Sequence, residues 1–233
     1  MDRWARLTWQ AGDPAHMAQV LGERLGIAPT PSRRAAGAWD LWLGTELLEV
    51  VPWRSEQAGD EPTAEGRLLF EPVMQVGASV DDADDADDAH DPDLAAARQQ
   101  SPSSVTLAAV IWATVDLERA EAELALWLEP LANPAPLVDE PHLGARGRVR
   151  TTTGLPGGRL VLLEPITEGA IAASLARDSE GPCGLYVLSA PMPQVSDGPA
   201  RRHDGPIGAS VRLRTAVRAG PHLLLLVPGT IAP

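Results

Sequence analysis

The stretch that decides the fold is Thr106–Ala120, which reads TLAAVIWATVDLERA. Its first part is an almost unbroken apolar run of the length and composition typical of a buried strand. Asp116 follows the run and precedes residues with helical apolar spacing, among them Leu117 and Ala120. Because an aspartate side chain can accept a hydrogen bond from the first turn of a helix, Asp116 predicts a helix start. The segment therefore predicts a strand followed by a capped helix.

A similar order opens the chain. Trp4–Gln10 (WARLTWQ) predicts a strand, and Asp13 followed by Pro14 predicts the start of a helix. Apolar residues then recur with helical spacing as far as Gly26, which can end the helix. The same local signals thus occur in two distant parts of the sequence.

Hairpins are expected after both helices and once more near the C-terminus. The expected pairs are Ala38–Leu43 with Glu46–Trp53, Arg146–Thr153 with Gly158–Glu164, and Ala209–Val217 with His222–Val227. A short helix, Glu168–Arg177, leads to a third opening strand at Cys183–Ser189, after which we expect only a loop over Pro191–Pro206. Gly66–Pro72 (GRLLFEP) predicts one further strand.

Charge and composition exclude several functions. The net charge of −13 is concentrated in Val80–Asp93, which holds eight aspartates, and the chain has no lysine. We therefore expect no nucleic-acid partner and no Schiff-base lysine. The lone Cys183 excludes an intrachain disulfide. The acidic tract has too few apolar residues to fold, so we expect an N-terminal unit at 1–76, a disordered acidic linker or loop at 77–104, and a second unit at 105–233.

The expected location is the cytoplasm. No apolar run reaches the roughly 18 residues that a membrane span needs, and the first residues lack the apolar core of a signal peptide. A chain with one cysteine also suits a reducing compartment. We therefore expect neither a membrane partner nor export.

The order of strand, Asp-capped helix and hairpin ending in Leu-Leu-Glu resembles the vicinal oxygen chelate (VOC) superfamily, which includes glyoxalase I, bleomycin-resistance proteins and extradiol dioxygenases. The resemblance rests on Thr114–Ala120, Gly158–Pro165 and Glu180–Val187, and Trp39–Trp53 resembles the glyoxalase-like branch. It implies an α+β fold in which repeated βαβββ modules form curved mixed or antiparallel sheets around a cleft. The last module lacks most of its helix.

The resemblance also implies where a metal would be held, by a His or Gln on each opening strand and a Glu on each hairpin. The corresponding positions here are Arg6 and Glu46, Ala109 and Val161, and Gly184 and Leu224. One carboxylate among six positions cannot hold a divalent cation, which needs at least three converging ligands. We therefore expect no metal and no cofactor.

The cleft is expected to bind a small molecule. Strand alternation places Arg6, Thr8 and Gln10 on one face of their strand. The resemblance implies that this face lines the cleft, with Glu46 beside Arg6 and Ile111 on the opposite wall. Aliphatic residues with a few polar anchors suit a mostly apolar ligand. The histidines are expected at the surface. Among them, His203 is expected in a loop and His222 in a turn.

Three functions remain open at this stage. One is a metal-free protein that binds a small molecule in the cleft. Another is a VOC enzyme, namely a lyase, isomerase or dioxygenase. Such an enzyme would work either without a metal or with a metal held by ligands outside the inherited positions. The third is a degenerate assembly partner, such as a homodimer in which a second copy supplies a missing module. Whether the chain catalyses a reaction is not decided by its sequence.

Overall fold

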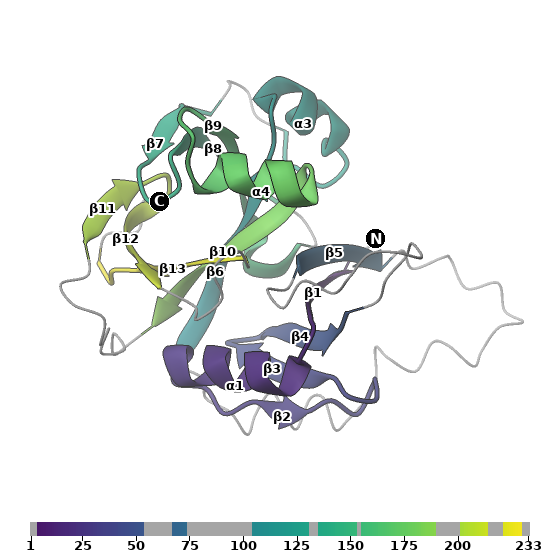
Figure 1. Ribbon diagram of the computed structural model, residues 1–233. Coiled ribbons are helices and arrows are strands. Elements are labelled where there is room, and N and C mark those ends of the chain that lie inside the picture. Colours follow the sequence, from purple (N-terminus) through teal and green to yellow (C-terminus); the bar gives the residue numbers. More distant parts are fainter. Residues whose placement is uncertain are drawn as a thin grey trace, which may run out of the picture.

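The computed structural model describes residues 4–53, 67–73, 104–130, 135–152, 155–189, 201–213 and 221–229. They form an α+β structure of two mixed sheets with few helices, which confirms the expected class (Figure 1). The acidic stretch Val80–Asp93 lies outside the described residues. Within the described part, no helix is long and apolar enough to cross a membrane.

The five-stranded sheet has the strand order β2-β3-β4-β1-β5. Its elements are β1 (Trp4–Ala11), α1 (Pro14–Leu25), β2 (Thr30–Pro31), β3 (Trp39–Leu43), β4 (Glu46–Pro52) and β5 (Arg67–Val73). Strands β1 and β4 are parallel, whereas β3–β4 is a hairpin and β5 runs antiparallel to β1. The strand expected from the GRLLFEP segment is thus confirmed and joins the first sheet.

The eight-stranded sheet has the order β11-β12-β13-β10-β6-β9-β8-β7. Its strands are β6 (Val105–Ala113), β7 (Val138–Glu140), β8 (Ala145–Thr151), β9 (Arg159–Pro165), β10 (Gly181–Ser189), β11 (Arg202–Gly205), β12 (Gly208–Leu213) and β13 (His222–Leu226). Two helices belong to this part, α3 (Leu117–Glu123) and α4 (Ala170–Asp178). Strands β6 and β10 are antiparallel neighbours in the middle of the sheet.

Helix α1 begins and ends as its sequence predicts. The Asp13 carboxylate accepts a hydrogen bond from the His16 backbone N–H at 3.0 Å, and Pro14 occupies the first turn. Gly26 ends the helix with a φ of 69°, in the left-handed region that glycine adopts without strain. The buried face of the helix packs on β3 and β4.

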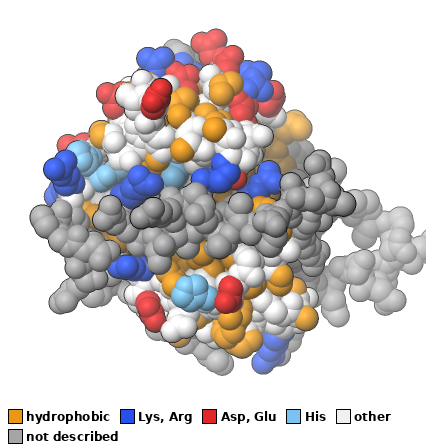
Figure 2. Space-filling view, in the orientation of Figure 1, with side chains coloured by type: hydrophobic (Ala, Val, Ile, Leu, Met, Phe, Trp, Pro, Cys, Tyr) orange, Lys and Arg blue, Asp and Glu red, His pale blue; other side chains and the backbone are white. Residues whose placement is uncertain are grey.

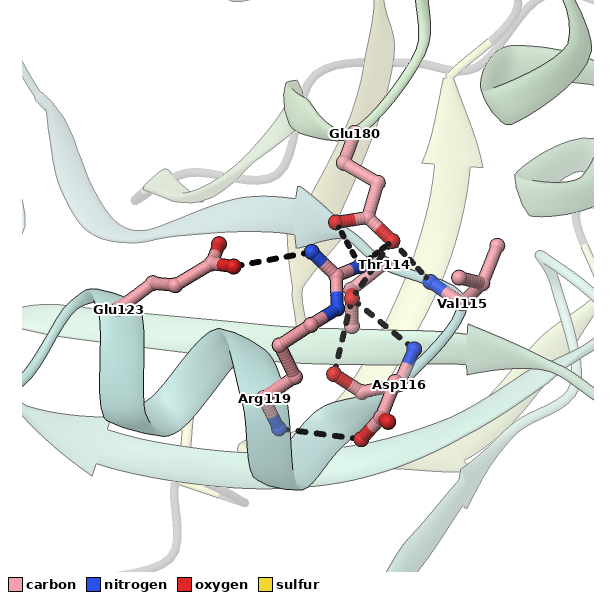
Figure 3. Close-up of polar contacts among 6 residues, drawn as sticks. All are labelled: Thr114, Val115, Asp116, Arg119, Glu123 and Glu180. Carbon is pink, nitrogen blue, oxygen red and sulfur yellow. Dashed lines mark hydrogen bonds and ion pairs between the residues drawn. The ribbon is translucent and has the colours of Figure 1, made fainter.

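The start of α3 is held by a polar network that reaches from β10 (Figure 3). Asp116 caps the helix by accepting from the Arg119 N–H at 3.0 Å. Glu180 lies just before β10, and its carboxylate accepts from the Val115 N–H at 2.8 Å and from the Thr114 hydroxyl at 3.1 Å. The Arg119 guanidinium binds both oxygens of the same carboxylate at 2.5 Å. The residues on which the family resemblance rests therefore fasten the β6–α3 turn to the middle of the sheet.

One expected loop contains a strand. The segment Pro191–Pro206 was expected to lack regular structure, yet β11 occupies part of it and pairs with β12. His203 therefore lies on a strand and not in a loop. His222 begins β13 and is only 7% exposed, so the expectation of a surface histidine in a turn is wrong. Short edge strands of this kind carry a weak alternating pattern, because their position depends on a distant partner strand.

Two hydrophobic clusters stabilise the molecule. The larger cluster joins both sheets, since it contains Leu7 and Trp9 of β1 together with Val105 of β6 and Leu185 of β10. The smaller cluster lies on the other face of the eight-stranded sheet and includes Ile111 and Tyr186. Burial of this apolar surface is the main favourable contribution to folding.

Candidate functional site

A row of polar residues crosses the five-stranded sheet. Strand pairing places Thr8 of β1 beside Glu49 of β4, Glu49 beside Asp40 of β3, and Asp40 beside Thr30 of β2. Paired residues of adjacent strands point to the same face of a sheet. The four residues, which we call the polar row, therefore lie side by side on one face.

The centre of the polar row is removed from solvent. Thr8 is 4% exposed and Glu49 is 2% exposed. The Glu49 carboxylate accepts a hydrogen bond from the Ser32 hydroxyl at 3.1 Å. In contrast, the Thr8 hydroxyl is buried and has no hydrogen-bond partner in the described structure. Because buried hydroxyl groups are nearly always hydrogen-bonded, the Thr8 hydroxyl is a donor and acceptor whose hydrogen-bonding capacity is unused.

The polar row is bordered by apolar and amide side chains on the same face. Trp42 and Leu47 form the neighbouring cross-strand pair on one side. Gln10, which is 8% exposed, pairs with Val51 on the other side. A polar strip between apolar borders suits a molecule that has an apolar body and one hydrogen-bonding group.

The structure corrects the expected position of Glu46. Strand β4 alternates, so Glu46 shares the face of Leu48 and Val50, which are core residues. Thr8 lies on the opposite face, beside Glu49. Glu46 therefore does not form one wall with Thr8 and Gln10, as the family register had implied, and Glu49 takes that place.

Arg6 is placed only by its backbone. It lies in β1 opposite Glu71 of β5. Its side chain lies outside the described residues.

Ile111 lies in a packed core and not on the wall of a cleft. Its side chain is 0% exposed and belongs to the smaller hydrophobic cluster. Ala109, Val161 and Leu224, three of the inherited metal positions, are buried in the same cluster. Aliphatic side chains fill the face of the sheet that was expected to open into a cleft. They pack against one another and against α4.

These residues do not fit the metal that the family resemblance implies. Aliphatic side chains offer no lone pair to a cation. In the part of the chain that the structure describes, no group of three His, Cys, Asp or Glu side chains is arranged to hold a metal ion.

The serine–histidine pair of the described structure is not arranged for nucleophilic catalysis. Ser174 of α4 lies 3.0 Å from Nε2 of His222, which suggests a serine–histidine pair. However, Arg212 donates to the other ring nitrogen at 3.1 Å, and burial together with this cation lowers the pKa of His222 to about 3. A histidine of such low basicity is a poor general base at neutral pH. The pair therefore has a structural role.

A shallow groove lies beside the N-terminus of α1. It has a volume of about 410 Å³ and is lined by Asp13, Ala15, His16, Gln19, Pro29 and Trp39. Figure 2 shows the surface over α1, where hydrophobic, acidic and histidine atoms lie close together. The groove contains none of the expected site residues.

Comparison with known proteins gives similar solved structures and no sequence relative. No family model matches the chain, and no curated protein matches it. Methylmalonyl-CoA epimerase from Mycobacterium tuberculosis is 20% identical over 57% of this chain and 93% of its own, with a TM-score of 0.44. A variant of 4-hydroxymandelate synthase from Streptomyces coelicolor is 13% identical over 97% of this chain and 71% of its own, with a TM-score of 0.38.

Glu49 and Asp40 are the site residues that the sequence analysis missed. The signal was present, because the Glu46–Glu49 segment (ELLE) carries a carboxylate on each face of a strand. Which of the two glutamates lies on the face of Thr8 depends on the pairing of β4 with β1, and the sequence alone does not give that pairing. Thr8 and Gln10 were placed on a common face by alternation alone, as the structure has them.

Proposed function

We propose that this chain is a metal-free protein of VOC type that binds a small, mostly apolar molecule on the polar row of its five-stranded sheet. The ligand's polar group would hydrogen-bond to Thr8, and its apolar body would lie against Trp42 and Val51. Glu49 would accept a further hydrogen bond, and Gln10 would accept or donate one. The buried, unpartnered hydroxyl of Thr8 is the observation that carries the proposal.

Strand order supports the module hypothesis on which this proposal rests. In three parts of the chain an opening strand runs parallel to the last strand of a hairpin, namely β1 with β4, β6 with β9 and β10 with β13. A further strand then pairs with the hairpin on its outer side in each case. Beside β1, β5 occupies the antiparallel position that β10 occupies beside β6. Repetition of one module accounts for this order.

The test uses Thr8→Val, which removes the hydroxyl and keeps the shape of the side chain. Fragments carrying one hydroxyl on an aromatic ring are screened by NMR against the ¹⁵N-labelled protein, and shifts in β1 and β4 identify binders. Loss of one hydrogen bond is worth about 0.5–1.5 kcal/mol, so we expect Thr8→Val to weaken the binding of such a fragment roughly two- to twelvefold. The free variant should be as stable as the parent or slightly more stable, because a buried unpartnered hydroxyl is removed.

Thr151→Val is the matched control, since Thr151 lies on an exposed position of β8. It should leave fragment binding unchanged. If Thr8→Val bound the fragments as tightly as the parent and also lowered the free energy of unfolding by more than about 1 kcal/mol, the hydroxyl would have an internal partner and the proposal would be wrong.

A further inference from the structure

The eight-stranded sheet curls until its two edge strands, β7 and β11, lie against each other. In the described structure these strands are not paired by backbone hydrogen bonds, so side chains join them. Gly205 of β11 contacts the carboxylate of Glu140 in β7 so closely that a methyl group on Gly205 would overlap it. We call this junction the seam. Histidine and arginine side chains gather on the surface over β11 and β12 (Figure 2).

Glu140 and His142 connect the seam to the rest of the sheet. The Tyr186 hydroxyl donates a hydrogen bond to the Glu140 carboxylate, which also accepts from the His142 backbone N–H at 3.1 Å. Nε2 of His142 lies 2.9 Å from the Ser210 carbonyl oxygen in β12. The His142 ring also contacts the His203 ring edge-on at 4.6 Å between centroids. These contacts bind the β7 side of the seam to β10, β11 and β12.

Arg212 and His222 make further hydrogen bonds that stabilise the same region. Arg212 donates to the His142 carbonyl oxygen at 3.3 Å and to Nδ1 of His222 at 3.1 Å. Because arginine stays protonated in proteins, Nδ1 of His222 must be the acceptor and the ring proton must lie on Nε2, which faces the Ser174 hydroxyl. His222 can therefore take up a second proton only by giving up its hydrogen bond with Arg212.

We propose that His222 is an acid-sensitive latch of the seam: protonation of its Nδ1 displaces the Arg212 guanidinium, releases His142, and parts β11 and β12 from β7. The charge balance favours this sequence of events. His222 in its protonated form would be a buried cation facing Arg212 of β12 and Arg177 of α4. Both arginines lower the pKa of His222, although Asp178 pairs with Arg177 and the Glu140 carboxylate interacts with Arg212. Like charges at such distances repel strongly where water is excluded.

The direction of the pH effect follows from three groups. Burial and Arg212 lower the pKa of His222 from 6.5 to about 3, and burial lowers the pKa of His142, so the open seam binds more protons and is favoured as pH falls below 6.5. Burial raises the pKa of Glu140, which favours the closed seam in acid and acts in the opposite direction. The pKa of His222 changes most among the three groups, from 6.5 to about 3, so acid opens the seam.

Tyr186 supplies a selective probe, because it is the only tyrosine in the chain. The full-length protein is labelled with ¹³C-tyrosine and ¹⁵N-histidine and titrated by NMR from pH 7.5 to 2.5. We expect His222 to remain neutral well below pH 6 and to take up its proton in the same step that shifts the Tyr186 resonance. The amides of β1 and β4 should keep their native positions in that step, which separates seam opening from global unfolding.

The variant His222→Asn keeps an acceptor for Arg212 at the position of Nδ1 but cannot be protonated. It should move the Tyr186 step to lower pH by at least one unit, whereas His16→Asn, at an exposed position on α1, should leave the step unchanged. A Tyr186 step at the parent pH in His222→Asn would overturn the proposal. If that variant does not fold, the parent protein still decides, because a His222 that titrates near pH 6.5 without moving Tyr186 overturns it as well.

Discussion

Cys183 is an inert thiol in the folded protein. It is 6% exposed, and burial together with Asp178 raises its pKa to about 12. At pH 8 only about one thiol in ten thousand is then ionised, and the thiolate is the reactive form. We expect the native protein to resist Ellman's reagent for at least the time in which the denatured protein reacts completely. Because the chain has one cysteine, any fast reaction of the native protein would contradict this directly.

The Glu140–Tyr186 hydrogen bond is expected to stabilise the folded state. Both residues are 0% exposed, so a carboxylate that loses the phenol donor cannot recover the bond from water. Tyr186→Phe should lower the free energy of unfolding by about 1–3 kcal/mol in denaturant titrations, since a buried acceptor is left with fewer partners. Tyr186→Phe combined with Glu140→Gln should cost less than the two single changes added together. Strict additivity would show that the two side chains do not interact.

At the level of elements, Glu180 couples the start of α3 to β10. Burial acts to raise its pKa, but hydrogen bonds from Val115, Arg119 and Thr114 outweigh burial and the pKa is lowered. A depressed carboxyl pKa contributes stability above the unfolded value near 4.5, and this contribution is lost as pH falls through the folded pKa. Glu180→Gln should therefore be less stable than the parent at pH 7, and the difference should shrink below pH 4. An undiminished difference at pH 3 would exclude this charge-dependent role.

Local signals allowed several elements to be predicted, and long-range pairing explains the rest. Helix α1 follows from Asp13 and Gly26, whose side chain and backbone act within a few residues. Thr8 shares a face with Gln10 by alternation alone. By contrast, the face on which Glu46 lies follows from the β1–β4 pairing, and the register of the resembling family does not reproduce that pairing.

The interior of the eight-stranded sheet could not be predicted from residues taken singly. Ile111 suits the wall of an apolar cleft as well as a packed core, and only the positions of its neighbours distinguish the two. His222 follows a proline, which favours a turn, yet it begins a strand because β13 pairs with β10. Tertiary pairing of this kind regularly overrides local preference.

The whole molecule is expected to unfold as one unit, because the larger hydrophobic cluster contains side chains from both sheets. Leu7 of β1 is 0% exposed and lies in this cluster with Val105 and Leu185 of the other sheet. Leu7→Ala should cost about 2–5 kcal/mol through lost burial and the cavity left behind. The loss should appear equally in the β1 amide signals and in the Tyr186 resonance, although Tyr186 belongs to the smaller cluster.

Leu163→Ala, in the smaller cluster, is the matched control, since Leu163 is also 0% exposed. In a cooperative molecule both variants should show coincident unfolding curves from the two probes. If Leu7→Ala removed the β1 signals at a denaturant concentration where Tyr186 kept its native shift, the two sheets would be separate folding units. The shared cluster would then contribute little to the coupling between the two sheets, and a structural change at the polar row would not be transmitted to the seam.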